Sequence, residues 1–314
     1  MNKAISKENA IVAYKAFDEN FRCRDFQYEV GKEYEIKGEI KRCERGFHAC
    51  ESPMEVFDYY DMFNSRFAEV EQSGQIDKED DNKSTKICSS RIKIKAELKL
   101  ADIINIGIEW LKDITSSSKV KADIDFNDNG CYSAQIGSSG DSAKIGSSGD
   151  YAQIGSSGYY AQIGSSGDSV KIGSSGDSAK IGSSGDYAKI GSSGDYAKIG
   201  SSGDSAKIGS SGDSAKIGSS GDSAKIGSSG DSAKINSTGE YSVIMCAGKN
   251  SAAKAKAGSW ITLSEWVYNE EKGRFIPKCV KTEYVDGTRI KADTWYQLKK
   301  GKFIEIFGSS KLFH

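Results

Sequence analysis

The sequence is poor in several residues that usually reveal a function. It has only 2 Pro and 2 His among 314 residues. So few histidines leave little material for His-based catalysis or metal clusters. No apolar run approaches the roughly 18–20 residues that cross a bilayer, and the first residues lack the apolar core of a secretory signal. We therefore expect a cytoplasmic protein that neither spans a membrane nor is secreted.

An excess of charge of either sign is also missing. The chain has 43 Lys and Arg against 44 Asp and Glu, which gives a net charge of −1. This balance argues against a protein that binds nucleic acid or anionic membranes through bulk charge alone.

The seven cysteines, in a chain without a secretory signal, are expected to be reduced thiols rather than disulfides.

What the sequence does have is a repeat. Residues 137–235 are eleven nonapeptides of the form G-S-S-G-D-[S/Y]-A-[K/Q]-I, interrupted only by Tyr159 and Val170. Gly/Ser-rich segments are often flexible linkers, but a linker does not need a small apolar residue and an Ile at fixed phase. Self-similarity at a fixed period is typical of a solenoid.

The repeat predicts a parallel β-solenoid with an 18-residue coil, made of two nonapeptides, and two facing sheets. We expect a strand at Ser142–Ile145, with Ala and Ile pointing inward, and a five-residue Gly-Ser-Ser-Gly-Asp corner in which Gly supplies positive φ. About six coils should form, and a 27-residue triangular coil is the alternative. On this geometry, a deletion of two nonapeptides preserves the coil phase and a deletion of one does not.

The outward side chains of the solenoid are the candidate contact residues. Tyr replaces the usual Ser at several corners, and Lys alternates with the inward residues on the strands. Solvation and an interaction face are both open interpretations of these side chains and of the Asp files. The residues that we select as a binding face are Tyr151, Tyr160, Tyr187, Tyr196, Lys189 and Lys198.

Calcium binding does not fit the repeat. In nonapeptide rolls that bind calcium, the motif is G-G-x-G-x-D-x-U-x. Here Ser replaces the second Gly and the Asp lies one position too early, so each corner offers a single misplaced carboxylate. We expect no cofactor and no calcium.

Two folded regions flank the repeat. Residues 1–115 predict a small α+β domain with a strand at 11–17, a hairpin at 28–36, a strand at 91–100 and helices at 52–63 and 101–114. Residues 116–129 are a linker and residues 130–258 the solenoid. Residues 259–314 predict an antiparallel β cap, with strands at 260–263, 275–280, 288–291 and 303–306 and a hairpin turn at Asp286-Gly287.

One cluster of sulfur and imidazole groups is a candidate metal site. Cys43, His48 and Cys50 form C-x4-H-x-C, and Cys23 lies upstream. Four such ligands could bind tetrahedral zinc, but the C-x2-C pair of most zinc sites is missing. Buried reduced thiols, a zinc site and a Cys–His nucleophile remain open, and the first is favoured. We assign no catalytic residue.

The same region carries a family resemblance. Cys23-Arg24-Asp25-Phe26-Gln27-Tyr28 is followed by Gly46-Phe47-His48-Ala49-Cys50, and Gly258-Ser259-Trp260 follows the repeat. The chain resembles an uncharacterised family of bacteriophage and prophage proteins that join this N-terminal module to I-G-S-S-G-D-x-A-K repeats. The resemblance implies a phage-related cytoplasmic protein and brings no established activity.

These observations favour a binding protein over an enzyme. The specific hypothesis is an anti-defence factor, such as an anti-CRISPR inhibitor, that occludes a protein surface or nucleic acid of a bacterial defence complex. One alternative is a structural virion or tail-fibre component that forms a homo-oligomer. A second is an enzyme centred on the N-terminal module.

Overall fold

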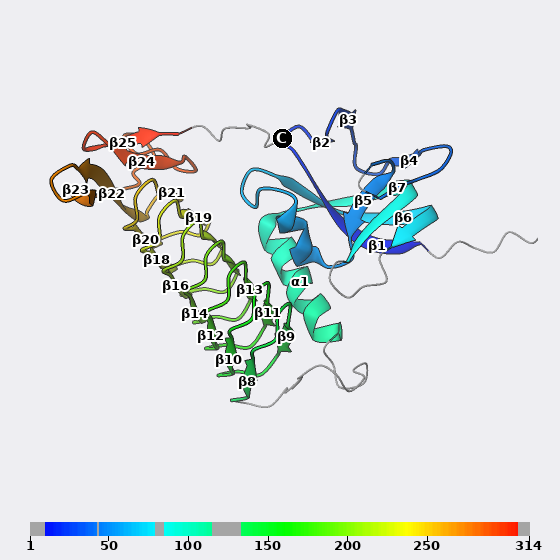
Figure 1. Cartoon of the computed structure of the whole chain (residues 1–314), viewed down its shortest axis with the longest axis horizontal. Helices are drawn as coiled ribbons and strands as arrows, with labels where there is room; N and C mark the ends of the chain where they lie inside the picture. The colour runs from blue at the N-terminus through cyan, green and yellow to red at the C-terminus, as the bar shows by residue number, and fades with distance from the viewer. Residues whose placement is uncertain (1–9, 43, 79–84, 115–132, 307–314) are drawn as a thin grey trace, which may run out of the picture. The chain divides into compact units, whose positions relative to one another are not determined.

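The computed structural model describes residues 10–42, 44–78, 85–114 and 133–306 (Figure 1). The chain divides into two compact units, residues 1–110 and residues 111–314, which are described one at a time. The predicted linker 116–129 lies outside the described residues. Within the described part of the chain, no helix has the length and apolar character needed to cross a membrane.

The first unit is an antiparallel sheet that closes on itself. Strand β1 pairs with both β5 and β6, and β7 pairs with β4, β5 and β6, so β1, β6, β7 and β5 form a ring. A short hairpin, β2–β3, lies outside this ring. The strands are β1 (Ile11–Phe17), β2 (Arg22–Cys23), β3 (Phe26–Gln27), β4 (Glu33–Glu35), β5 (Phe47–Cys50), β6 (Arg66–Lys78) and β7 (Lys86–Leu98).

The ring has an apolar interior and an apolar outer face. Alternate residues of β1 divide between them: Ala13 and Phe17 belong to the inner cluster, Tyr14 and Ala16 to the outer one. The outer cluster also contains residues of the 3₁₀ helix η1 (Pro53–Asp58) and of helix α1 (Leu100–Ile114). The predicted strand at 11–17 and helix at 101–114 are both present.

Two local predictions in this unit were wrong. The helix expected over 52–63 is only a 3₁₀ segment, and the Ser52 side chain makes no capping hydrogen bond. The Glu55 carboxylate, expected to complete the capping box, instead accepts hydrogen bonds from the backbone N–H and hydroxyl of Thr85. The hairpin expected over 28–36 is absent because β4 pairs with β7, a tertiary contact that outweighs the local turn.

The second unit contains the predicted 18-residue coil. Every repeat strand pairs in parallel with the strand two nonapeptides away, so Ile154 lies between Ile136 and Ile172. The pairing excludes a 27-residue coil and builds two sheets. Sheet 1 contains β8 (Gln135–Ser138), β10 (Gln153–Ser156), β12 (Lys171–Ser174), β14 (Lys189–Ser192), β16 (Lys207–Ser210), β18 (Lys225–Ser228) and β20 (Val243–Cys246).

Sheet 2 has the same construction. Its strands are β9 (Lys144–Ser147), β11 (Gln162–Ser165), β13 (Lys180–Ser183), β15 (Lys198–Ser201), β17 (Lys216–Ser219), β19 (Lys234–Ser237) and β21 (Ala252–Lys254). The degenerate copies after residue 235 continue both sheets, so the solenoid runs for about seven turns rather than six.

The strands are shifted by two residues from their predicted position. Each strand is Lys/Gln-Ile-Gly-Ser, so Ile and the first Ser of the unit point inward while Lys and Gly point outward. The Ala before most of these strands is also buried, as expected. The interior therefore contains files of Ala, Ile and Ser, and the ten inward Ser hydroxyls from Ser147 to Ser228 are buried without hydrogen-bond partners among the described residues.

The corner glycines do not supply the positive φ that the sequence led us to expect. Positive φ falls on the Ser or Tyr after the Asp, for example 57° at Tyr187 and 55° at Ser205. The corner Gly is required by close stacking: a Cβ at Gly194 would overlap the carbonyl oxygen of Gly176 in the coil before. An Ala at this position would push successive coils apart.

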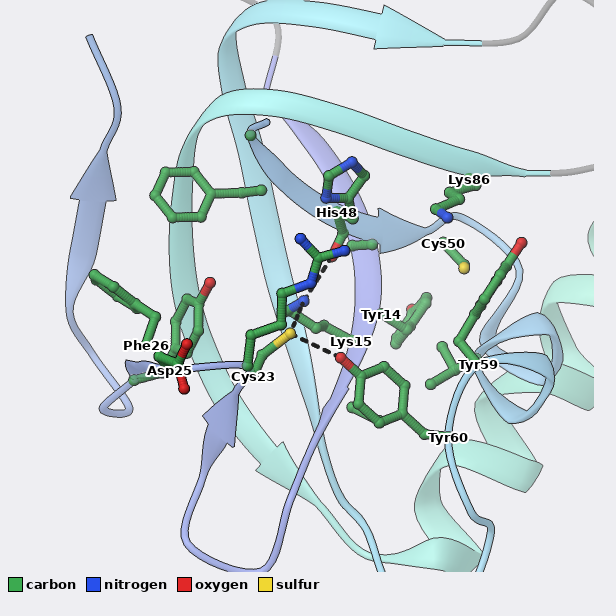
Figure 2. Close-up of a pocket in the computed structure, with 17 residues that line it drawn as sticks. Tyr14, Lys15, Cys23, Asp25, Phe26, His48, Cys50, Tyr59, Tyr60 and Lys86 are labelled. Carbon is green, nitrogen blue, oxygen red and sulfur yellow. Dashed lines mark hydrogen bonds between the residues drawn. The ribbon is translucent and has the colours of Figure 1, made fainter. Parts of the chain in front are cut away.

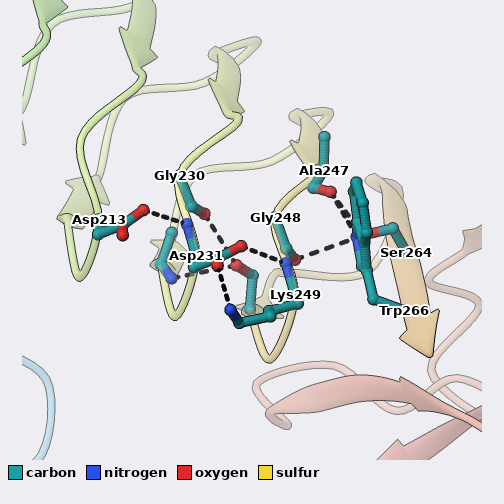
Figure 3. A network of polar contacts seen from close by, with 10 residues as sticks. Asp213, Gly230, Asp231, Ala247, Gly248, Lys249, Ser264 and Trp266 are labelled. Carbon is teal, nitrogen blue, oxygen red and sulfur yellow. Dashed lines mark hydrogen bonds and ion pairs between the residues drawn. The ribbon is translucent and has the colours of Figure 1, made fainter. Parts of the chain in front are cut away.

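The Asp files are part of the backbone hydrogen-bonding system. Each Asp carboxylate accepts a hydrogen bond from the backbone N–H one coil later, as in Asp213 N–H to Asp195 Oδ1 at 2.7 Å. Figure 3 shows the end of this series, where Asp231 accepts from Lys249 N–H and also forms an ion pair with Lys249 Nζ at 2.8 Å. Tyr159 interrupts the series because it has no carboxylate to offer the next coil.

The C-terminal residues extend both solenoid sheets. Strand β22 (Trp260–Asn269) pairs in parallel with β20 and antiparallel with β23 (Arg274–Tyr284). Strands β24 (Tyr296–Lys299) and β25 (Lys302–Glu305) continue sheet 2. Trp266 Nε1 donates to the carbonyl of Ala247 at 2.9 Å and joins this cap to the last coil (Figure 3). The cap therefore covers the edge that the last coil would otherwise expose.

One predicted strand of the cap is missing. Residues 288–291 form a bend, because Asp286 Oδ1 accepts hydrogen bonds from the backbone N–H groups of Thr288, Arg289 and Ile290. The Asp286-Gly287 pair thus starts an Asx-type turn rather than a hairpin. The predicted strands at 260–263 and 303–306 lie in β22 and β25, and that at 275–280 lies in β23.

Candidate functional site

The outer face of sheet 1 carries a row of glycines that the backbone does not need. An added Cβ would meet no atom within 4 Å at any of them, and none has a positive φ. Glycine in a strand is less stable than alanine by about 0.5–1 kcal/mol, so six in one row favour a role other than folding. We call this row the glycine file: Gly137, Gly155, Gly173, Gly191, Gly209 and Gly227.

The glycine file forms the floor of a shallow groove. Four of its members, Gly155 to Gly209, line a concavity of about 650 Å³ together with neighbouring serines. Two residues before these glycines, the same strands begin with exposed lysines that do not line the concavity; we call Lys171, Lys189, Lys207 and Lys225 the lysine file. At the C-terminal end, the half-exposed Met245 takes the glycine position and closes the row. The groove is therefore shallow and bare, with a row of positive charges beside it.

The residues predicted to form a binding face divide between the two sheets. Tyr151, Tyr187 and Lys189 border sheet 1, whereas Tyr160, Tyr196 and Lys198 border sheet 2. The four tyrosines are 49–62% exposed. Tyr187 lies in the corner before β14, and Lys189 and Gly191 belong to that strand, so an exposed aromatic ring, an ammonium group and bare backbone follow one another here.

The first unit contains a second candidate site, a pocket of about 590 Å³. It is lined by β1, β2, β5, the segment Arg24–Phe26 and the residues that follow η1 (Figure 2). Gly46 allows β5 to begin here, because a Cβ at its φ of 133° would overlap Cys88 Sγ. In the next residues Phe47, His48 and Ala49 all line the pocket, and Phe47 and Ala49 also belong to the inner cluster. The Gly-Phe-His-Ala-Cys motif is thus the frame of the pocket.

Lys15 lies at the base of this pocket. Its side chain is only 5% exposed, and Nζ donates to the carbonyl of His48 at 2.9 Å and contacts Cys23 Sγ at 3.5 Å. The rings of Phe17 and Tyr28 lie 5.6 and 5.8 Å from Nζ. Cys23 Sγ also shares a 2.8 Å hydrogen bond with Tyr60 OH. Among the described residues, these contacts hold the ammonium group in place and include no carboxylate.

His48 is neutral at physiological pH in this site. Burial and the nearby charges of Lys15, Lys86 and Arg24 lower the pKa of its imidazole to about 4, against a weak opposing hydrogen bond with Gly46. The three cations therefore gather around a ring that carries no charge of its own. Arg24 has a strained backbone with φ of 54°.

The zinc candidates do not form a metal cluster within the described residues. Cys23, His48 and Cys50 all line the pocket, but no group of three His, Cys, Asp or Glu is close enough there to hold a metal ion. Cys43 lies outside the described residues. Burial, with Glu55 nearby, raises the pKa of Cys50 to about 12, so this thiol stays protonated and is a poor nucleophile. All described cysteines are free thiols.

Sequence reasoning missed the glycine file and the cationic side of the pocket. Both left a signal. Each repeat has one Gly directly after the Ile and a second Gly directly before the Asp. A five-residue corner accounts for the Gly before the Asp and leaves the Gly after the Ile without an assigned role. Lys15 is the only charged residue in the otherwise apolar strand Ile-Val-Ala-Tyr-Lys-Ala-Phe. A lysine with apolar residues on both sides is unusual in a strand and indicates that its side chain is partly buried.

Comparison with known proteins adds one match. Residues 11–106 match the family model described as Domain of unknown function (DUF7666), which covers the ring of strands and the pocket. No curated protein and no solved structure matches the chain.

Proposed function

We propose that this protein is a phage-related binding protein that acts in the host cytoplasm as an anti-defence factor, such as an anti-CRISPR inhibitor. It occludes a protein surface or nucleic acid of a bacterial defence complex, and the contact surface is the outer face of sheet 1. The phage origin rests on the sequence resemblance. The contact surface rests on the glycine file.

The glycine file supports a contact role because it lowers stability without serving the fold. The corner glycines are fixed by stacking, but the six outer glycines have room for a side chain. A bare strip lets a partner approach the backbone, and the exposed lysine file beside it supplies positive charge. A partner with a flat, acidic or phosphate-bearing surface fits this strip best.

The test fills the groove without disturbing the coil. Thr at Gly173 and Gly191 adds a side chain into open space and favours the strand, so the double variant should be at least as stable as the wild type. Gly137→Thr is the matched control, since Gly137 belongs to the same file but does not line the groove.

The variants are compared by affinity capture from bacteria that carry a nuclease defence system and from a matched strain without it. We expect the wild type and Gly137→Thr to capture and inhibit a component of that system, and the double variant to lose about tenfold or more in affinity. Capture by the double variant at wild-type strength would remove sheet 1 from the contact. A stable trimer that captures nothing would instead favour the virion or tail-fibre alternative.

A further inference from the structure

The pocket of the first unit has a charge that its own residues do not balance. Besides Lys86, which also lines it, Lys15 and Arg24 contribute two positive charges, and Asp25 contributes one negative charge. Among the described residues, neither Lys15 nor Arg24 forms an ion pair with a carboxylate. Buried charges in proteins are normally paired, because an isolated ion loses its hydration.

Lys15 shows the imbalance most clearly. The contacts of its ammonium group are a neutral carbonyl, a thiol and two ring faces, which hold a cation but do not neutralise it. An anionic group in the pocket would supply the missing charge. Phosphate suits this position because it accepts hydrogen bonds from both a lysine and an arginine.

Aromatic rings border the same pocket. Phe26 and Tyr59 are 45% and 47% exposed, and both line it. In Figure 2 they lie on opposite sides of the group formed by Cys23, Lys15 and His48. Lys86 Nζ lies 4.5 Å from the centre of the Tyr59 ring. Exposed rings at the edge of a cationic pocket can stack on a planar ligand.

We propose that this pocket binds a small anionic ligand with an aromatic ring, of the nucleotide class. Lys15 and Arg24 contact the phosphate, and Phe26 or Tyr59 stacks on the base. The cavity of about 590 Å³ is within the size range of small-molecule sites. The neutral imidazole of His48 can donate or accept one hydrogen bond to the ligand and adds no charge. This inference does not depend on what the solenoid binds.

The experiment uses the full chain, with calorimetry and thermal unfolding as measurements. The probes are AMP, ADP and NAD⁺, with adenosine, ribose 5-phosphate and inorganic phosphate as fragments. At least one nucleotide should bind and raise the melting temperature. Adenosine and inorganic phosphate should bind about tenfold or more weakly than that nucleotide, because each lacks one of the two contacts.

Arg24→Gln and Lys15→Met are the test variants, and Arg22→Gln is the control, since Arg22 is an exposed arginine next to the pocket that does not line it. Arg24→Gln should weaken nucleotide binding about tenfold, while Arg22→Gln should bind like the wild type. Arg24 is exposed, so this comparison holds even if Lys15→Met fails to fold.

Three outcomes would overturn the proposal. The first is that none of the nucleotides binds. The second is that inorganic phosphate binds as tightly as every nucleotide, which would leave a plain anion site without an aromatic contact. The third is that binding is unchanged in Arg24→Gln and in a folded Lys15→Met, which would place the ligand elsewhere.

Discussion

The solenoid and the N-terminal ring of strands build their candidate sites in opposite ways. In the solenoid, each residue meets the same residue type one coil away, as Lys189 meets Lys171 and Lys207. In the ring, the pocket brings together Lys15, Cys23 and His48 from separate strands. The solenoid therefore offers a long surface with many equal positions, whereas the pocket offers one place where each side chain is different.

This difference has a consequence for mutation. A change at one coil leaves the other coils intact, so the solenoid face tolerates single outward substitutions. A change at one pocket residue alters the whole site. Positions within the solenoid should also differ in their tolerance of mutation. The corner glycines are fixed by stacking between coils, whereas the outer glycines have room for a side chain.

The largest effect is expected from two glycines that are three residues apart. In Gly194→Ala, the new Cβ would overlap the carbonyl of Gly176, so we expect a loss of about 3 kcal/mol in the free energy of unfolding. Gly191→Ala adds the same atom into open space and should be neutral or slightly stabilising. Urea unfolding measures both. Equal losses would mean that the outer glycines are also structural.

A smaller effect is expected along the Asp series. Asp195→Ala removes the acceptor of the Asp213 N–H and should cost about 1–2 kcal/mol. Tyr159→Asp should do the reverse and stabilise by about 1 kcal/mol, because it gives the N–H of Asp177 a carboxylate. Thermal unfolding of the two variants and the wild type checks this. Destabilisation by Tyr159→Asp would show that repulsion between stacked carboxylates outweighs the hydrogen bond.

The pocket should make stability depend on pH through His48. Its pKa is about 4 in the folded protein and near 6.5 when unfolded. Below pH 6.5 the His48 imidazole is protonated in the unfolded chain but stays neutral in the folded chain. The free energy of unfolding therefore falls as the pH drops from 6.5 towards 4. We expect a loss of about 1 kcal/mol between pH 7 and pH 5, after allowance for the partial exposure of the ring.

The control for this pH effect is His48→Gln. Carboxylates also titrate towards low pH, so the quantity to compare is the change in unfolding free energy from pH 7 to pH 5 in each protein. The variant should lose less than the wild type over that interval. An identical loss in both would show that the His48 ring is not shielded as the structure indicates.

The smallest effect is expected from deletion of repeats. The 18-residue coil led us to expect that only whole coils can be removed. The strand register leads us to a different prediction, because both sheets use the same Lys-Ile-Gly-Ser strand in the same alignment. Removing residues 173–181 transfers later strands to the other sheet, where they meet identical partners. Circular dichroism and thermal unfolding should show that deletions of one and of two nonapeptides both fold with little change in melting temperature.

The repeat alone predicted the solenoid and the inward direction of Ala and Ile, and it favoured the 18-residue coil that the strand pairing then established. It could do so because the partner of each residue is another copy of itself at a fixed distance along the chain. Local patterns also predicted β1 and α1, whose apolar residues repeat with the period of the element. The unusual lysine in β1 was visible too, although its neighbours were not.

Only the tertiary structure decided which glycine of each repeat stacks and which stays open. Each repeat contains two glycines, and the sequence alone does not show at which of them a Cβ would fit. That depends on the neighbouring coils, because Gly194 lies against the backbone of the coil before and Gly191 faces solvent. The pocket was decided in the same way. His48 and Lys15 are 33 residues apart and meet because β1 and β5 are neighbours in the ring, and pairing between distant strands is set by the packing of the whole unit rather than by local sequence.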